Sequence, residues 1–222
     1  SQQRSGSHSC GASLLSTTKA LSAAHCVDGA IASTLRVVAG LHQRSDESTA
    51  QASDVTTYTM HENYQGDRAT YSNDIAIINL ATAFTLSSTV VLLTLPPDNT
   101  NDFVGATCMI TGWGRTSSSN ILPDTLQEAP ITPIGTTECD NLMQGVIGTV
   151  IWDNHLCLYD TANQIGSCNG DSGGPCNCPD GGSGWYVAGV TSWGVSSGGN
   201  CMQTYPSVYT RTSGYLDWIA AN

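Results

Sequence analysis

The stretch Gly170-Asp171-Ser172-Gly173-Gly174-Pro175 decides how the rest of the chain is interpreted. Its serine lies among small residues, which leave the hydroxyl open to a substrate. Glycine adopts backbone angles that other residues resist, so main-chain N–H groups here can face a reacting carbonyl oxygen. The pattern G-x-S-x-G also describes a glycine-rich turn with a solvated serine, and one motif alone does not separate these interpretations. The order of the other polar residues along the chain helps to separate them.

A serine hydroxyl is a weak nucleophile that needs a base, usually a histidine oriented by a carboxylate. None of the five histidines follows Ser172. A hydrolase with a nucleophile elbow requires its histidine after the serine, and Pro175 disfavours the helix that would follow the elbow. No Asp precedes His25, which excludes the order Asp, His, Ser with His25 as the base. The order His, Asp, Ser remains.

His25 is the best candidate for the base, because small neighbours and a possible disulfide at Cys26 would fix its backbone. Asp74 begins the apolar run 75–80 and is the best candidate for the orienting carboxylate. Each residue alone also has a structural interpretation, as a core histidine and as a strand cap. A solvated or structural role is expected for the other histidines, His8, His42, His61 and His155.

The composition indicates a protein of short strands that functions outside the cell. Of the 222 residues 40% are hydrophobic and only 11% charged, with 23 glycines, which favours strands and turns over long helices. A formal net charge of −11 repels nucleic acid and anionic membranes, so neither is an expected partner. Nine cysteines predict disulfides in an oxidising, extracellular compartment, and the odd number means that at least one thiol is free or pairs with another molecule.

The pattern of residues along the chain predicts strands separated by turns. A Pro-, Asn- and Asp-rich segment at 94–102 is the best linker candidate. Residues 213–221 are predicted to form a short helix that Ser213 caps, with Leu216, Ile219 and Ala220 at helical spacing. No apolar run is long enough to predict a transmembrane helix. Strands are predicted at 14–15, 20–21, 34–41, 53–60, 73–80, 107–113, 129–134, 156–159, 185–193 and 207–211.

Six motifs occur together in one order along the chain. They are Ala23-Ala24-His25-Cys26, Asp74-Ile75-Ala76, Gly112-Trp113-Gly114, Gly170–Pro175, Ser192-Trp193-Gly194 and Pro206-Ser207-Val208-Tyr209. With them the sequence resembles the chymotrypsin-like and trypsin-like serine proteases over nearly its whole length. Met60-His61-Glu62-Asn63-Tyr64, Ile151-Trp152-Asp153-Asn154-His155 and Cys178-Pro179-Asp180-Gly181-Gly182 resemble the earthworm fibrinolytic proteases, or lumbrokinases.

This resemblance implies an all-β fold of two six-stranded antiparallel β-barrels (chymotrypsin-like) with a short C-terminal helix. The first barrel would comprise residues 1–100 and carry His25 and Asp74, and the second would comprise 101–222 and carry Ser172. The implied function is that of a secreted serine endopeptidase, monomeric and without a cofactor or metal, acting on protein substrates such as fibrin. The alternative is an inactive protease homologue that serves as a binding module.

The resemblance also assigns roles to single residues. Ser172 would be the nucleophile, His25 its base and Asp74 the residue that orients His25, while the N–H groups of Gly170 and Ser172 would form the oxyanion hole. An uncharged pocket would favour apolar or medium-sized substrate side chains over Arg and Lys. Its floor at Gly166 is the place where trypsin-like relatives carry Asp. The implied substrate-binding residues are Gly166, Ser167, Ser192, Trp193, Gly194 and Ser207.

The cysteines are assigned in the same way, as the pairs Cys10–Cys26, Cys108–Cys178, Cys139–Cys157 and Cys168–Cys201. Cys176 is left over and is expected to be a buried, inert thiol, close enough to Cys178 for the two to exchange the Cys108 partner. A zinc site at Cys168, Cys176 and Cys178 is disfavoured, because an oxidising compartment favours disulfides.

Two departures from the family pattern are visible. Leu41 stands where calcium-binding relatives have Glu, so no calcium is expected there. In the family, a newly cleaved amino terminus pairs with the Asp before the nucleophile, here Asp171. Ser1-Gln2-Gln3-Arg4 lacks that segment, and we expect this sequence to be part of a longer mature enzyme.

Overall fold

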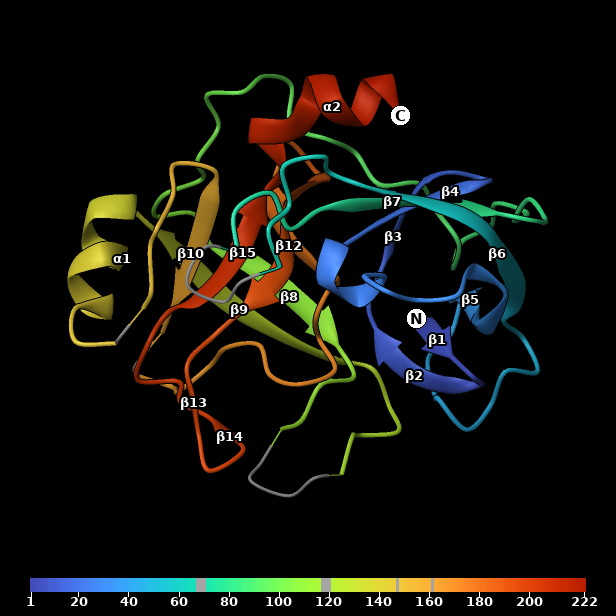
Figure 1. The fold of residues 1–222 in the computed structure, drawn as a ribbon, viewed down its shortest axis with the longest axis horizontal. Coiled ribbons are helices and arrows are strands. Elements are labelled where there is room, and N and C mark those ends of the chain that lie inside the picture. The colour runs from blue at the N-terminus through green and yellow to red at the C-terminus, as the bar shows by residue number, and fades with distance from the viewer. Residues whose placement is uncertain (67–70, 117–120, 147, 161) are drawn as a thin grey trace.

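The structure of the protein is a computed structural model that describes residues 1–66, 71–116, 121–146, 148–160 and 162–222. Two antiparallel β-sheets lie side by side, one from the first half of the chain and one from the second (Figure 1). The all-β fold class expected from the sequence is confirmed.

The first sheet has seven strands in the order β2-β1-β5-β6-β7-β4-β3. Apolar side chains on its inner face, among them Leu35, Val37, Val55 and Ile78, form one core cluster. The strands are β1 Gln2–Arg4, β2 Ser7–Cys10, β3 Ser13–Ser16, β4 Lys19–Ser22, β5 Leu35–Ala39, β6 Gln51–Met60 and β7 Ala76–Leu80.

This sheet differs in detail from the six-stranded barrel that was expected. It is curled and ends at β2 and β3, which do not pair with each other. Strands β1 and β2 were not predicted, because residues 1–10 carry no apolar alternation. The fully buried Gln2 explains this: its amide donates to Cys26 O (3.3 Å) and accepts from Ser22 Oγ (3.2 Å), so a polar side chain takes a core position.

The second sheet closes into a six-stranded barrel in the order β10-β15-β12-β11-β8-β9. Its core includes Ile110, Ile131, Leu156 and Tyr209. A small hairpin, β13 Ser196–Ser197 with β14 Asn200–Cys201, lies outside the barrel. The barrel strands are β8 Cys108–Gly112, β9 Gln127–Ile134, β10 His155–Tyr159, β11 Pro175–Pro179, β12 Trp185–Trp193 and β15 Ser207–Arg211.

The two α-helices of the described residues lie on the outside of the sheets (Figure 1). The sequence did not predict α1, Thr136–Met143, which is short and begins with two β-branched residues that favour strands. At the C-terminus a 3₁₀ turn, Thr212–Tyr215, leads into α2, Leu216–Ala221. Ser213 does not cap the helix as expected, because its hydroxyl donates to Asn101 O (2.7 Å).

The stretch 81–107 between β7 and β8 forms no helix or strand and includes the predicted linker. The predicted domain boundary at 100/101 lies within this stretch and stays a prediction. None of the helices in the described residues is long and apolar enough to cross a membrane.

Candidate active site

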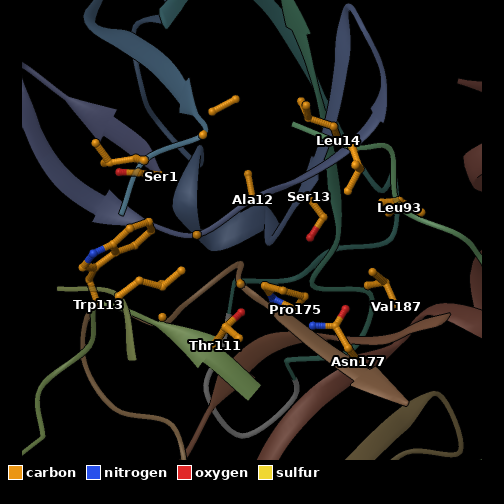
Figure 2. A pocket seen from close by; sticks show the side chains of 18 of the residues that line it. Ser1, Ala12, Ser13, Leu14, Leu93, Thr111, Trp113, Pro175, Asn177 and Val187 are labelled. Atoms are coloured by element: carbon orange, nitrogen blue, oxygen red, sulfur yellow. The ribbon is translucent and has the colours of Figure 1, made fainter. Parts of the chain in front are cut away.

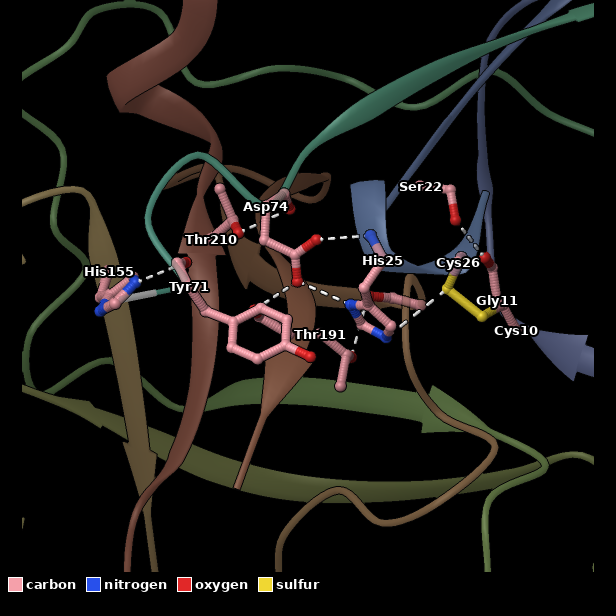
Figure 3. A network of polar contacts seen from close by, with 12 residues as sticks. Cys10, Gly11, Ser22, His25, Cys26, Tyr71, Asp74, His155, Thr191 and Thr210 are labelled. Carbon is pink, nitrogen blue, oxygen red and sulfur yellow. Dashed lines mark hydrogen bonds and ion pairs between the residues drawn. A yellow bond between two sulfur atoms is a disulfide. The ribbon is translucent and has the colours of Figure 1, made fainter. Parts of the chain in front are cut away.

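His25 and Asp74 form a pair at the seam between the two sheets (Figure 3). His25 lies in a 3₁₀ turn, Ala24–Cys26, directly after β4, and a disulfide joins this turn to Cys10. The His25 backbone N–H donates to Asp74 Oδ1 (2.9 Å), and the ring Nδ1 lies 2.7 Å from Asp74 Oδ2. The two carboxylate oxygens therefore fix the position and the orientation of the imidazole.

Asp74 is fully buried, and both its carboxylate and its backbone carbonyl have partners in the second sheet. Ser192, on β12, donates its hydroxyl to Asp74 Oδ2 (2.5 Å), and Thr210, on β15, donates to the Asp74 carbonyl (2.8 Å). A buried carboxylate needs such hydrogen bonds to remain charged. Asp74 is thus held by both sheets at once, and the sequence did not indicate the Thr210 contact or the hydroxyl contact of Ser192.

Ser172 lies in the turn that precedes β11, and this turn packs directly on the His25 segment. The Gly11 N–H donates to the Ser172 carbonyl (2.7 Å), and Gly173 N–H donates to Thr191 O (2.8 Å). A Cβ on Gly173, whose φ is +76°, would lie 2.7 Å from Gly11 O and 3.2 Å from Ala23 N. Only glycine permits this approach, which places Ser172 beside the turn that carries His25.

The Ser172 hydroxyl and the His25 ring do not form a hydrogen bond, although both residues lie in the described part of the chain. The contact that the structure gives His25 Nε2 is with the Cys26 sulfur, at 3.8 Å. The side chain of His25 is partly exposed, with 20% of its surface accessible, so Nε2 can form a hydrogen bond with the Ser172 hydroxyl when a substrate is bound. Catalytic hydrogen bonds are often long without substrate and tighten when it binds.

Asp171 fixes the other side of the Ser172 turn. Its carboxylate accepts the backbone N–H groups of Gly114 (2.7 Å) and Cys168 (3.0 Å). Burial raises the pKa of Asp171, and these two hydrogen bonds act in the opposite direction. Gly170 has φ +104°, a conformation that glycine tolerates, and its carbonyl lies 2.8 Å from His8 Nε2.

The predicted pocket floor is more crowded than the sequence suggested. The Ser167 N–H donates to Ser207 Oγ (3.1 Å), which brings these two predicted residues together next to Gly166. The amide of Gln203 also lies against Gly166, where an added Cβ would be 2.8 Å from Gln203 Cδ, and it donates to Ser167 O (3.3 Å). Gln203 lies in an irregular loop, so no periodicity in the sequence could have predicted this contact.

The remaining predicted substrate-binding residues continue from Ser192 along the end of β12. Trp193 is half-buried, and its ring lies edge-on to His155 with the centroids 6.2 Å apart. Gly194 has open space on the side where a Cβ would project. This end of β12 therefore offers an accessible backbone next to the Asp74–His25 pair.

A cavity of about 730 Å³ lies between the two sheets (Figure 2). Apolar side chains such as Leu14, Leu93 and Val187 line it, together with Trp113. Gly170 and Asp171 also border the cavity, so it reaches the turn that carries Ser172. No sequence pattern predicted this cavity, because its walls come from segments that are distant along the chain.

The four disulfides are the pairs that the resemblance implied: Cys10–Cys26, Cys108–Cys178, Cys139–Cys157 and Cys168–Cys201. Cys176 is free and fully buried, and burial raises its pKa strongly. Its sulfur lies 4.0 Å from that of Cys178. Among the described residues, two sets lie within metal-binding distance, Cys10/His25/Cys26 and Cys108/Cys176/Cys178. Each set contains a disulfide, whose two sulfurs are not available as thiolate ligands.

A closed antiparallel barrel beside a second β-sheet, with a buried Asp bonded to a partly exposed His at the seam and a serine turn packed beside them, is the architecture of a serine protease of the His, Asp, Ser order. The family model described as Trypsin matches residues 1–219, and the chain belongs to the trypsin family of serine proteases.

Three relatives illustrate the similarity within this family. The chain is 58% identical to "Fibrinolytic enzyme, isozyme C" of Lumbricus rubellus, over 100% of this chain and 93% of the relative. It is 37% identical to "Chymotrypsin-like serine proteinase" of Haliotis rufescens, over 98% of this chain and 83% of that protein. It is 36% identical to "Chymotrypsin-like elastase family member 1" of Bos taurus, over 98% and 81% respectively.

Proposed function

We propose that Ser172, His25 and Asp74 hydrolyse peptide bonds through an acyl-enzyme. The observation that carries this proposal is the paired contact of Asp74 with both the backbone and the ring of His25, beside the turn that holds Ser172. Because Asp74 accepts the proton on Nδ1, Nε2 is the basic nitrogen and is available to the serine hydroxyl.

In the proposed reaction, Ser172 Oγ attacks the carbonyl carbon of the substrate while His25 Nε2 takes the hydroxyl proton. The imidazolium that forms is stabilised by Asp74, and it then gives the proton to the leaving amine. Water repeats the sequence on the acyl-enzyme and releases the acid. Asp74 keeps its charge throughout, supported by the hydroxyl of Ser192.

The N–H groups of Gly170 and Ser172 would bind the oxyanion that develops in each step. The fixed geometry of this turn supports the proposal, since Asp171 holds one side and Gly11 the other. Preorganised donors of this kind need no rearrangement when charge develops on the oxygen, and losing one typically costs about 3–4 kcal/mol in the barrier.

We further propose a preference for neutral, apolar or medium-sized side chains before the cleaved bond. Gly166, Ser167 and Ser207 offer no charge, and the Gln203 amide occupies the space above Gly166 that a longer substrate side chain would need. Ser192, Trp193 and Gly194 would bind the substrate main chain as an added strand. Arg and Lys side chains would find no counter-charge here.

The physiological setting we propose is extracellular, with protein substrates that include fibrin, in line with the printed name of the Lumbricus rubellus relative. Four disulfides and the acidic surface support a secreted, monomeric enzyme that does not bind nucleic acid or membranes.

The proposal is tested with a series of peptide amides that differ only in the residue before the cleaved bond, followed by fibrin plates. The expected result is cleavage after apolar residues, slow cleavage after Arg and Lys, lysis of fibrin, and loss of all activity in Ser172→Ala. Rapid cleavage after Arg with far slower apolar substrates would contradict the pocket assignment. An inactive wild type that still binds protein would support the binding-module alternative.

A further inference from the structure

We propose that His155 is a positioning residue, which holds Tyr71 and Trp193 as two walls of the groove for substrate residues that precede the cleaved bond. The proposal rests on the function proposed above. It adds a residue that determines how much higher kcat/KM is for an extended substrate than for a short one. The sequence suggested only a solvated or structural role for His155.

The ring of His155 is buried, at 3% exposure, and both of its nitrogens have a partner. The backbone N–H of Trp152 points at Nδ1 (3.2 Å), and an amide N–H can only donate, so Nδ1 carries no proton. The proton is therefore on Nε2, which donates to the Tyr71 carbonyl at 3.1 Å. One neutral tautomer satisfies both contacts, and this fixes the ring in a single orientation.

His155 begins β10 of the barrel, whereas Tyr71 belongs to the segment of the first sheet that leads to Asp74. The bond between them thus crosses the seam (Figure 3). The Tyr71 ring projects from this point toward His25 and lies edge-on to it, with centroids 5.8 Å apart. His155 therefore fixes the backbone of Tyr71, whose ring forms a wall of the groove beside His25, the proposed base.

The second wall is Trp193, whose ring meets the His155 ring at 74°. Trp193 follows Ser192, the residue bonded to Asp74. A peptide that pairs with the end of β12 and presents its carbonyl to Ser172 would pass between Trp193 and Tyr71. The single buried ring of His155 contacts the Trp193 ring and the backbone carbonyl of Tyr71, and through these two contacts it sets the spacing between the walls.

His155 is separable from the catalytic pair, because Asp74 has its own contacts across the seam. Thr210 holds the Asp74 carbonyl and Ser192 its carboxylate, independently of His155. The neighbouring Asn73 is held in turn by Tyr215, whose hydroxyl donates to Asn73 Oδ1 (3.0 Å). Loss of the His155 bond should therefore loosen Tyr71 and leave the His25–Asp74 geometry intact.

The test compares His155→Asn with His155→Gln. The Asn oxygen can still accept the Trp152 N–H, but its side chain is too short to reach the Tyr71 carbonyl, whereas the Gln amide can donate to that carbonyl. Two substrates with the same residue before the cleaved bond are used, a single-residue ester and a tetrapeptide amide. His42→Asn, at an exposed histidine, is the control variant.

For His155→Asn we expect kcat/KM on the tetrapeptide to fall about fivefold to tenfold, mostly through KM, as expected for the loss of one hydrogen bond that fixes a binding wall. On the ester, this variant should stay within about twofold of wild type, and His155→Gln should stay within about twofold on both substrates. His42→Asn should behave as wild type.

Equal losses on the ester and the tetrapeptide would overturn the proposal, because His155 would then act on the catalytic pair or on the fold as a whole. An unchanged tetrapeptide rate in His155→Asn would overturn it as well. A small serine-directed fluorophosphonate, applied to wild type and to all variants, distinguishes a failure of the positioning role from a failure of the proposed function. Wild type that is not labelled contradicts the proposed function itself, whereas equal labelling of all variants with unequal tetrapeptide rates supports the positioning role.

Discussion

Replacing Gly114 by Ala tests whether Asp171 holds the Ser172 turn in place. A Cβ on Gly114 would overlap the Asp171 carboxylate, lying 2.5 Å from Oδ1 and closer still to Oδ2 and Cγ. No real Cβ tolerates such contacts, so the carboxylate has to move. In moving it leaves the N–H groups of Gly114 and Cys168, which are its two hydrogen-bond donors.

The magnitude follows from the bonds that are lost. Hydrogen bonds to a charged group contribute about 1.5–3 kcal/mol each, so the turn loses roughly 3 kcal/mol or more of its conformational preference. Asp171 lies between Gly170 and Ser172, whose N–H groups are the proposed oxyanion donors. Because losing one such donor lowers kcat by about 10²–10³-fold, we expect a decrease of that size with little change in KM.

The assay is the steady-state hydrolysis of a tetrapeptide amide, with Gly135→Ala as the matched control. Gly135 has φ −64° and no atom within 4 Å of an added Cβ, so this Gly-to-Ala change should be silent. A Gly114→Ala enzyme with wild-type kcat would refute the role given to Asp171, since the turn would then keep its shape without the Asp171 contacts. An effect confined to KM would also refute it.

Three further predictions follow from the site and the core. Asp74→Asn should lower kcat about 10⁴-fold with the fold intact, because the wrong tautomer of His25 is then favoured; this is the size of the effect known for the same change in a Ser-His-Asp triad. Steady-state kinetics measure the decrease in kcat, and circular dichroism shows whether the fold is intact. A decrease of less than tenfold would contradict the role of Asp74. Burial lowers the pKa of His155 in the folded protein, which therefore favours the neutral imidazole. The contribution of this effect to the free energy of unfolding is fully present above about pH 6.5, the pKa of histidine in the unfolded chain. As pH falls from there toward the folded pKa, unfolding free energy should decrease by up to about 1.4 kcal/mol per pH unit, and urea titrations should show a shallower decrease for His155→Gln. Cys176 is fully buried with a raised pKa, so iodoacetamide should modify one thiol in denaturant and none in the native protein, as counted by mass spectrometry; rapid native labelling would show that Cys176 is accessible.

The sequence predicted those features that depend on short stretches with a distinctive chemical pattern. The run after Asp74 is apolar and β-branched, which specifies β7 and places the carboxylate at its start. The glycines around Ser172 are needed because the turn packs on Gly11 and Ala23 with no room for side chains. Chain order then separated one class of serine hydrolase from the others.

The sequence could not predict the contacts that depend on tertiary placement. As a polar residue Gln2 is expected at the surface, but it is buried, and its amide forms hydrogen bonds with Cys26 and Ser22, which are about 20 positions away along the chain. Gln203 is distant from Gly166 along the chain, and only the fold brings its amide against that glycine. Nothing in the sequence distinguishes His155 from the other histidines outside the catalytic pair, because the partners of its two ring nitrogens are placed only by the tertiary fold. Such polar contacts leave no periodic signal along the chain.

The most direct test of the proposed catalytic centre is to react the purified protein with a fluorophosphonate and identify the modified residue by peptide mass spectrometry. We expect one adduct, on Ser172, that forms rapidly in wild type and is absent from Ser172→Ala. His25→Ala should react far more slowly, because the serine then has no base. No adduct on wild type, or an adduct on another serine, would contradict the claim that Ser172, His25 and Asp74 form the catalytic centre.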